Sequence, residues 1–186
     1  MQKVLFIGNS HTYYNDMVKL FADICKEYGI EVHCVALVSD SKTLEWHACE
    51  KDVQFNILYG DYDYIVMQDA AHPFAGKESL LKGVAKLNKY ISQTNSKRVL
   101  FMTWKEKRFL DKQQEMSTAY LSVGEKTKSL VAPVGDIWAN FDAENPDLEL
   151  YFSDGEHANE KGSLLAAIVI ANTIFNLGID VSDRIS

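Results

Sequence analysis

The chain has 186 residues, of which 47% are hydrophobic and 11% aromatic. This size and composition are typical of one globular domain with a full hydrophobic core, so we expect a single domain over residues 1–186 and exclude a disordered or fibrous protein. The formal net charge of -7 argues against nucleic acid or an anionic membrane as the main partner.

Three cysteines, Cys25, Cys34 and Cys49, are an odd and sparse set, and none is spaced as Cys-x-x-Cys. We therefore expect reduced thiols and neither a zinc site nor a redox pair. The first residues predict a strand without a charged leader segment or cleavage site, which favours a cytoplasmic protein unless a leader was removed. The longest apolar run, residues 164–170, is too short to span a bilayer, and we expect no membrane partner.

The first half of the chain alternates short apolar runs with segments of helical period. The expected elements in chain order are a strand at 4–7, a helix at 16–28, a strand at 31–38, a short helix at 43–48 and a further segment near 53–59. Asn15 is the expected N-terminal cap of the first helix, and Gly29 is its stop signal.

The second half continues this alternation. It predicts strands at 64–67, 98–103 and 130–134, and helices at 77–92, 112–129, just after Gly135 and at 160–177. Continuous apolar strands that alternate with helices are typical of a parallel sheet covered on both faces. The sequence therefore predicts a three-layer α/β/α fold around a five-stranded, doubly wound parallel sheet, flavodoxin-like, with right-handed crossovers.

A serine follows the first predicted strand at a sharp turn. Gly8, Asn9 and Ser10 come directly after the apolar residues 4–7. In an open parallel sheet, ligands bind beyond the carboxyl ends of the strands, at a switch point that the first strand normally borders. Ser10 is therefore a candidate nucleophile, and a serine hydroxyl needs an adjacent base to react.

An acid and a histidine stand three residues apart, just before the last predicted helix. Asp154 and His157 can project from one turn, where the carboxylate would orient the imidazole and stabilise the imidazolium. The alternative is that Asp154 only caps the helix and His157 is a surface residue. Together with the serine turn, the pair favours a catalytic triad of Ser10, His157 and Asp154.

These motifs resemble those of the SGNH/GDSL-type hydrolases. Residues 8–10 (Gly-Asn-Ser) look like the first motif block of that group, with asparagine where aspartate is commoner, and residues 154–157 (Asp-Gly-Glu-His) look like its last block. The helix that follows is similar too, through Asn159, Gly162, Ala166 and Ala167. Within the group, the chain most resembles the uncharacterised subset with a Gly-Asn-Ser start and a glutamine in the third block. The resemblance implies the SGNH hydrolase fold and a serine ester hydrolase.

The oxyanion-binding blocks of that group are altered in this chain. The group's second block offers a glycine amide, but residues 39–44 contain no glycine, so the main-chain N–H of Asp40 or Ser41 would have to replace it. The third block usually supplies an asparagine, whereas here Gln68 follows the third predicted strand and would donate its amide. One missing donor costs about 2.7–4 kcal/mol. The candidate oxyanion and substrate-binding residues are thus Gln68, Ser41, Asp40 and Asn9.

Other polar and aromatic residues carry weaker signals. The dispersed histidines His11, His47 and His72 favour polar loop positions over a metal site. A tryptophan could stack on a sugar ring, with packing in the core or a loop as the alternative. Trp104 is the best candidate for stacking, because it follows the fourth predicted strand.

The sequence predicts an esterase or acyl hydrolase that cleaves a small-molecule or carbohydrate ester, such as an acetyl group on a sugar, without metal or cofactor. One alternative is a flavodoxin-like module that binds phosphate or a flavin on the turn after the first strand, which leaves Asp154 and His157 unexplained. Another is a degenerate hydrolase that binds acylated glycans without cleaving them, because the oxyanion blocks are altered.

Overall fold

A computed structural model describes residues 1–185, and its centre is a five-stranded sheet. The strands in chain order are β1 (Gln2–Gly8), β2 (Val32–Val38), β3 (Tyr64–Met67), β4 (Lys97–Phe101) and β5 (Leu130–Ala132). All neighbours are parallel, in the spatial order β2-β1-β3-β4-β5. The fold class predicted from the alternation of strands and helices is confirmed.

The order of the strands reverses at β1. From β1 the chain crosses to β2 on one side, and later returns to the other side of β1 to form β3. Ile7 near the end of β1 pairs with Leu37 of β2 and with Met67 of β3. Connections that leave in opposite directions open a crevice at the carboxyl end of the sheet. The turn after β1 lies at this switch point.

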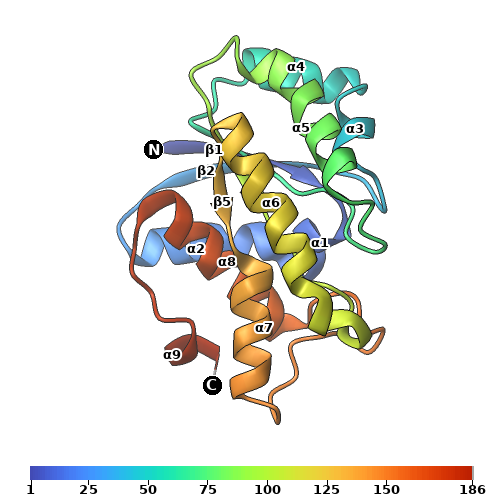
Figure 1. Cartoon of the computed structure of the whole chain (residues 1–186). Coiled ribbons are helices and arrows are strands. Elements are labelled where there is room, and N and C mark those ends of the chain that lie inside the picture. The colour runs from blue at the N-terminus through green and yellow to red at the C-terminus, as the bar shows by residue number, and fades with distance from the viewer. Residues whose placement is uncertain (186) are drawn as a thin grey trace.

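Helices cover both faces of the sheet (Figure 1). One face is covered by α2 (Met17–Glu27), α7 (Val134–Glu144) and α8 (Glu160–Phe175), and the other by α3 (Leu44–His47), α4 (Lys51–Tyr59), α5 (Lys77–Ile91) and α6 (Gln113–Thr127). In Figure 1, α4 and α5 lie above the sheet, and α2, α7 and α8 lie below it. These are the three layers that the sequence predicts.

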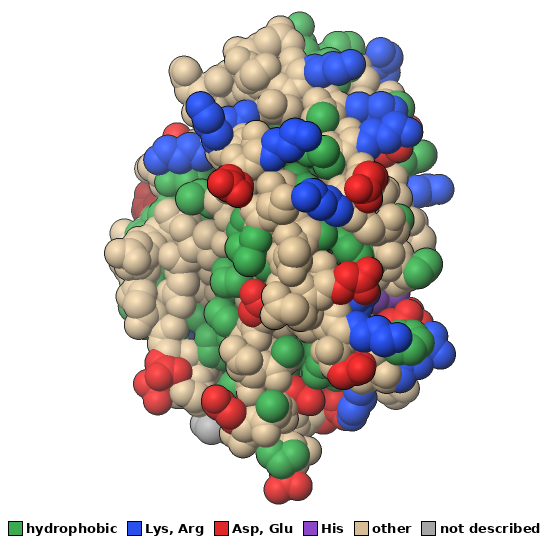
Figure 2. Space-filling model, in the orientation of Figure 1, with side chains coloured by type: hydrophobic (Ala, Val, Ile, Leu, Met, Phe, Trp, Pro, Cys, Tyr) green, Lys and Arg blue, Asp and Glu red, His purple; other side chains and the backbone are tan. Residues whose placement is uncertain are grey.

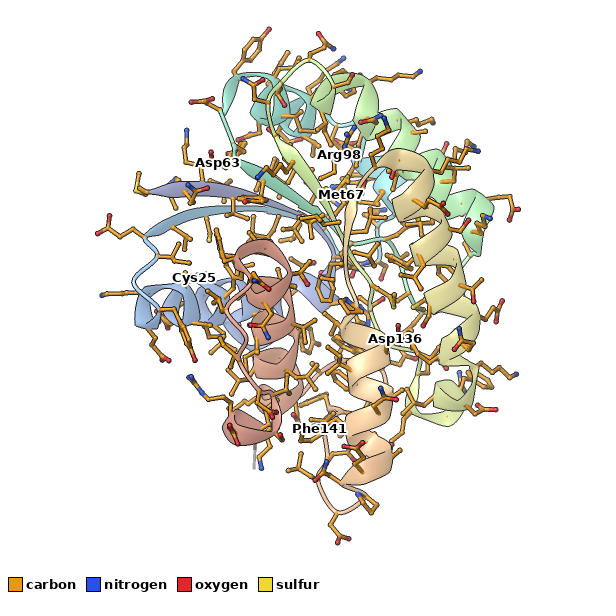
Figure 3. The ribbon with its side chains drawn as sticks, turned by 60° about the vertical axis from the view of Figure 1, so that its left-hand side comes forward. Cys25, Asp63, Met67, Arg98, Asp136 and Phe141 are labelled. Atoms are coloured by element: carbon orange, nitrogen blue, oxygen red, sulfur yellow. The ribbon has the colours of Figure 1, made fainter. Side chains whose placement is uncertain are left out.

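Alternate residues of each strand supply two separate cores. Val4 and Phe6 pack in the core beneath α2, α7 and α8, whereas Leu5 and Ile7 pack in the core beneath α3 to α6. All four side chains are fully buried, as expected for a central parallel strand. Figure 3 shows the first core from the side, with Phe141 of α7 between α7 and α8.

Some local elements differ from the sequence-based expectations. Residues 51–59 form the helix α4, where the sequence predicts a segment of no assigned type. Strands β4 and β5 each end two residues earlier than predicted, at Phe101 and Ala132. The short helices α1 (Ser10–Tyr13), η1 (Tyr14–Asp16), η2 (Lys107–Lys112) and α9 (Ser182–Ile185) were not predicted from the periodicity.

Asn15 does not cap α2, and that prediction is wrong. Its φ angle is 51°, and the next residue, Asp16, has a φ angle of 54°. Asn and Asp adopt this left-handed conformation more readily than other non-glycine residues, so together they form a sharp turn between η1 and α2. The Asn15 side chain therefore points away from α2. Its amide group donates to the Ala158 carbonyl at 3.0 Å and to Ser163 Oγ at 2.9 Å.

The molecular surface is charged unevenly. In Figure 2, lysine and arginine side chains gather in the upper part of the view, over the region of α4 to α6, and acidic side chains are more frequent below, over α7. Helix α5 alone carries Lys77, Lys82, Lys86 and Lys89. Within residues 1–185, no helix is both long and apolar enough to cross a bilayer.

The close packing at Gly162 gives a test of the fold. A Cβ at this position in α8 would lie 2.4 Å from the Leu150 carbonyl oxygen and 2.5 Å from the Trp138 ring. We expect Gly162→Ala to lower the free energy of unfolding by about 1–3 kcal/mol, because a well-packed core does not absorb an added methyl group. Urea denaturation measures this change. The control Lys161→Ala, on the exposed side of the same helix, should shift the midpoint much less; equal shifts would contradict the packing argument.

Candidate active site

The turn after β1 presents Ser10 at the switch point of the sheet. Asn9 follows the last residue of β1 and caps α1, because its side-chain oxygen accepts a hydrogen bond from the His11 N–H at 3.2 Å. Ser10 is the first residue of this helix and is partly exposed, whereas Asn9 and Thr12 are buried. The cap thus fixes the backbone around Ser10 while its hydroxyl stays accessible.

A compact loop before α8 carries Asp154 and His157. Tyr151 and Ala158 form an isolated antiparallel bridge, and the Phe152 N–H donates to the His157 carbonyl at 2.8 Å. Gly155, with a φ angle of 72°, permits the tight turn between them. The bridge closes the loop at its base and directs Asp154 and His157 to the same side.

The structure brings Ser10, His157 and Asp154 into one chain of hydrogen bonds. Ser10 Oγ lies 2.8 Å from His157 Nε2, and His157 Nδ1 lies 2.7 Å from Asp154 Oδ2. Both distances are within the range expected for a nucleophile, its base and the group that orients the base. With a proton on Nδ1, the imidazole donates to the carboxylate and accepts from the serine hydroxyl.

The Asp154 carboxylate makes three hydrogen-bond contacts in this loop. Burial opposes its negative charge, but the N–H of Glu156 at 2.8 Å, the ring of His157 and the N–H of His157 at 2.9 Å outweigh burial and lower the pKa of Asp154. Asp154 is therefore ionised at neutral pH. It does not cap α8, because the Asn159 side chain accepts from the Gly162 N–H and fills that role.

The N-terminal segment is fastened directly to the start of α8. The Asn15 amide donates to the Ala158 carbonyl and to Ser163 Oγ, and Ser163 Oγ in turn donates to the Tyr14 carbonyl at 3.2 Å. Ala158 is the residue next to His157. These bonds join residues that are 143 to 149 positions apart in the sequence. They therefore hold Ser10 and His157 at a fixed separation.

Two aromatic rings pack against the His157 imidazole. The Tyr14 ring stacks on it with a centroid distance of 4.1 Å and an interplanar angle of 12°, and the His11 ring stacks at 5.1 Å and 28°. Such contacts restrict the rotation of the imidazole. Tyr14 was not predicted from the sequence; the available signal was its position four residues after Ser10, next to a predicted catalytic turn.

His11 is a buried, neutral neighbour of His157. Burial lowers the pKa of His11 well below its usual value, and the nearby His72 and His157 lower it further. The His11 ring meets the His72 ring edge to face at 4.6 Å. Because His11 carries no charge at neutral pH, it does not repel a positive charge on His157.

Gln68 does not point its amide at the nucleophile, which corrects the expectation that it donates to the oxyanion. Its side chain is fully buried, and Oε1 accepts from the Asn9 N–H at 2.9 Å and from the Thr12 hydroxyl at 3.0 Å. Its Nε2 donates to the neighbouring Asp69 carbonyl. A Cβ at Gly8 would lie 2.6 Å from Gln68 Oε1, so the glycine is needed for this contact. Gln68 thus supports the Ser10 turn from below.

The other three candidate oxyanion residues lie around the same turn. The Asn9 amide is buried and donates to the Lys42 carbonyl at 3.2 Å, which joins the turn to the loop at 39–42. In that loop the Asp40 carboxylate accepts from the Tyr13 hydroxyl. Ser41 has a φ angle of 58°, the left-handed conformation that glycine favours. Within residues 1–185, the main-chain N–H groups of Ser10 and Ser41 make no backbone hydrogen bond, so both can donate to a ligand.

Trp104 is not a platform for a sugar ring; the alternative, packing in the core, is the one that the structure shows. It is fully buried, and its indole stacks on Trp138 with a centroid distance of 4.0 Å. Its Nε1–H donates to the Glu156 carbonyl at 2.9 Å, and its own carbonyl lies 3.0 Å from His72 Nε2. Trp104 therefore supports the loop that carries His157.

The three dispersed histidines lie in two places. The His11 ring packs on His157 and the His72 ring packs on His11, whereas His47 lies under the first turn, with Nε2 2.8 Å from the Gly8 carbonyl. In the part of the chain that the structure describes, no group of three or more His, Cys, Asp and Glu side chains is arranged to hold a metal ion.

Comparisons with known proteins identify the fold. No protein-family model and no curated protein matches the sequence. Among solved structures, a DUF4886 family protein from Bacteroides uniformis is 19% identical, with a TM-score of 0.71, over 98% of this chain and 85% of that one. A psychrotrophic esterase from Pseudoalteromonas sp. is 15% identical, with a TM-score of 0.69, over 95% and 98%. A catalytic mutant of an acetylxylan esterase from Geobacillus stearothermophilus is 13% identical, with a TM-score of 0.68, over 97% and 95%.

These similarities cover nearly the full length of this chain. A lipolytic protein of the G-D-S-L family from Veillonella parvula also aligns, with a TM-score of 0.67 over 95% of this chain and 100% of that one. The chain therefore has the fold of the SGNH/GDSL hydrolases, as the motif resemblance predicts.

The buried position of Gln68 leads to a prediction about stability. Gln68→Leu removes the acceptor of the Asn9 N–H and the Thr12 hydroxyl, and leaves both buried without a partner. We expect the free energy of unfolding to fall by about 1–3 kcal/mol, measured by urea denaturation. Gln93→Leu, at an exposed position after α5, is the matched control. An unchanged stability for Gln68→Leu would contradict the supporting role.

Proposed function

We propose that this chain is an ester hydrolase in which Ser10 is the nucleophile, His157 the general base and Asp154 the residue that orients the base. The observation that carries the proposal is the hydrogen-bonded chain from Ser10 Oγ to His157 Nε2 at 2.8 Å and from His157 Nδ1 to Asp154 at 2.7 Å. It lies at the switch point of the sheet, where open α/β folds bind ligands. The fold shared with esterases agrees with this reaction class.

The first half of the reaction forms an acyl-enzyme. As Ser10 Oγ attacks the ester carbonyl carbon, its proton passes to His157 Nε2, and the carbonyl oxygen becomes negatively charged. His157 then gives this proton to the alkoxy oxygen of the leaving alcohol as the C–O bond breaks. In the second half, a water molecule replaces the alcohol, and the same steps release the carboxylic acid and restore Ser10.

The environment of His157 favours the charge that it acquires in both halves. Asp154 is ionised and contacts Nδ1, so it stabilises the imidazolium. The neutral His11 adds no repulsion, and the stacked Tyr14 ring presents its π-face to the cation.

Main-chain N–H groups are the proposed donors to the oxyanion. The N–H of Ser10 is adjacent to the attacking oxygen, and the left-handed conformation of Ser41 gives the loop at 39–42 the backbone shape that a glycine would have. Gln68 acts indirectly, because it holds the Ser10 turn through Asn9 and Thr12. Each donor contributes about 2.7–4 kcal/mol to lowering the barrier.

The proposed substrate is a small acyl ester, with an acetyl group on a carbohydrate as the first candidate. One neighbour in fold is described as an acetylxylan esterase, which motivates this choice. The alternative of a flavin- or phosphate-binding module leaves the Ser10–His157–Asp154 geometry without a purpose. A degenerate hydrolase would keep this geometry but would not turn over an ester. Measurements of turnover and probe labelling distinguish it from an active hydrolase.

The nucleophile can be tested directly. We expect Ser10→Ala to abolish hydrolysis of p-nitrophenyl acetate and labelling by a fluorophosphonate probe, because both require an attacking hydroxyl. The circular dichroism spectrum and melting temperature should stay close to those of the wild type. The control Ser92→Ala, at an exposed serine after α5, should keep both activities. Turnover by the Ser10→Ala protein would exclude Ser10 as the nucleophile, and a wild-type protein that neither turns over nor labels would favour the degenerate hydrolase.

The role of Asp154 leads to a second kinetic prediction. Asp154→Asn loses the charge that selects the Nδ1–H tautomer of His157, and in serine triads such a change lowers kcat by about 10⁴-fold. The loss should appear in kcat for p-nitrophenyl acetate at neutral pH. Asp61→Asn is the control, because Asp61 is exposed and has a φ angle of 53°, which asparagine tolerates. A loss of less than about tenfold would contradict the proposed role.

A further inference from the structure

A large groove borders the loop that carries His157 and is not explained by the chemistry of acyl transfer. It has a volume of about 910 Å³ and lies between η1, the loop after α7 and the start of α8. Its walls include Asn15, Phe152 and Asn159. Ligand pockets in proteins span roughly 300–1,000 Å³, so this groove is large enough for much more than an acetyl group.

The wall of the groove is connected to His157 through the ring of Tyr14. Phe152 in its wall meets the Tyr14 ring edge to face at 6.4 Å, and Tyr14 stacks on His157 at 4.1 Å. The Phe152 N–H also donates to the His157 carbonyl at 2.8 Å. The groove therefore begins one aromatic ring away from the base that protonates the leaving alcohol. The alcohol part of the ester is the part that would extend into it.

Phe152 offers an exposed aromatic surface at this point. Its side chain is 50% exposed although it is fixed by backbone hydrogen bonds on both sides of the loop. Beside it, the Asn15 amide group donates to Ala158 and Ser163, and its Oδ1 makes no hydrogen bond within residues 1–185. An apolar ring face next to a free hydrogen-bond acceptor matches a sugar, which has apolar C–H faces and hydroxyl groups at its edge.

The charge of the groove restricts which sugars fit. Four carboxylates line it, against one ammonium group: Glu144, Asp147, Glu149, Glu160 and Lys161. Glu149 is paired with Lys107 at 2.5 Å, and the other three carboxylates make no ion pair within the described residues. Like charges repel a negatively charged ligand, so uronic acids and other anionic alcohols are disfavoured.

We propose that this groove binds the alcohol part of the substrate, a carbohydrate without negative charge, with Phe152 as the stacking platform beside Tyr14. The proposal rests on the proposed ester hydrolysis and adds the location and the charge of the leaving group. It also assigns Phe152 as a residue that determines specificity.

The stacking role is tested by comparing two substrates in one variant. The ratio of kcat/KM for an acetylated xylo-oligosaccharide to kcat/KM for p-nitrophenyl acetate should fall roughly tenfold in Phe152→Ala. Only the oligosaccharide has a sugar ring that can stack on Phe152, so only its kcat/KM should depend on this side chain. Phe55→Ala is the matched control: Phe55 is 53% exposed, on α4, on the other face of the sheet. Its ratio should equal that of the wild type. An unchanged ratio in Phe152→Ala would overturn the proposal.

A binding measurement tests the stacking role of Phe152 without turnover. Calorimetry with acetylated xylo-oligosaccharide should detect binding to Ser10→Ala, and this binding should weaken about tenfold in Ser10→Ala/Phe152→Ala. Equal affinity in the two proteins would place the sugar elsewhere and overturn the proposal.

The charge argument has its own test. In Glu144→Gln/Asp147→Asn, kcat/KM for an acetylated oligogalacturonide should rise about fivefold relative to that for the neutral oligosaccharide, and added salt should reduce the difference. Asp61→Asn/Glu125→Gln is a control with the same change of net charge away from the groove. A rise of equal size in this control would overturn the assignment of the charge effect to the groove.

These outcomes separate the two proposals. Hydrolysis of p-nitrophenyl acetate that depends on Ser10, together with an unchanged substrate ratio in Phe152→Ala, would retain the ester hydrolase and reject the groove. Absence of Ser10-dependent hydrolysis, with oligosaccharide binding that depends on Phe152, would retain the groove and reject the hydrolase.

Discussion

The site depends on the attachment of the N-terminal turn to the start of α8. Asn15 and Ser163 make this attachment, through hydrogen bonds to the Ala158 and Tyr14 carbonyls. Apart from the hydrogen bond between Ser10 and His157 itself, these bonds are the ones that join the two segments within residues 1–185. A shift of about 1 Å between reacting groups can cost around 100-fold in rate. The left-handed turn at Asn15 and Asp16 is the local cost of placing the asparagine where it can reach α8.

A second set of buried contacts fixes the turn from inside the sheet. Gln68 accepts hydrogen bonds from Asn9 and Thr12, and Gly8 leaves the space that its amide occupies. The glutamine at the end of β3 and the Gly-Asn-Ser turn at the end of β1 are therefore parts of one structure. In this chain the Gln68 side chain and the Gly-Asn-Ser turn therefore fix each other. It also shifts the proposed oxyanion donors from side chains to the main chain.

The surroundings of His157 combine three kinds of constraint. Trp104 holds the loop through the Glu156 carbonyl, the ring of Tyr14 limits the rotation of the imidazole, and His11 remains uncharged beside it. On the open side, the groove that starts at Phe152 adds an aromatic surface and excess negative charge. The proposed reaction thus takes place between the rigid, uncharged surroundings of His157 and the wide groove with its excess of carboxylates. This arrangement suits a small acyl group on a larger uncharged alcohol.

Local sequence patterns determined the fold class and the candidate triad residues. Strand and helix periods are properties of neighbouring residues, and both Gly-Asn-Ser and Asp-x-x-His are short motifs at element ends. The roles of Gln68, Trp104, Asn15 and Tyr14 were decided only by the tertiary structure. Gln68 meets Asn9 across 59 positions, and Trp104 meets Glu156 across 52. No local pattern specifies whether such a side chain faces a ligand or another buried group, because that depends on which distant segments the packed sheet and helices bring beside it.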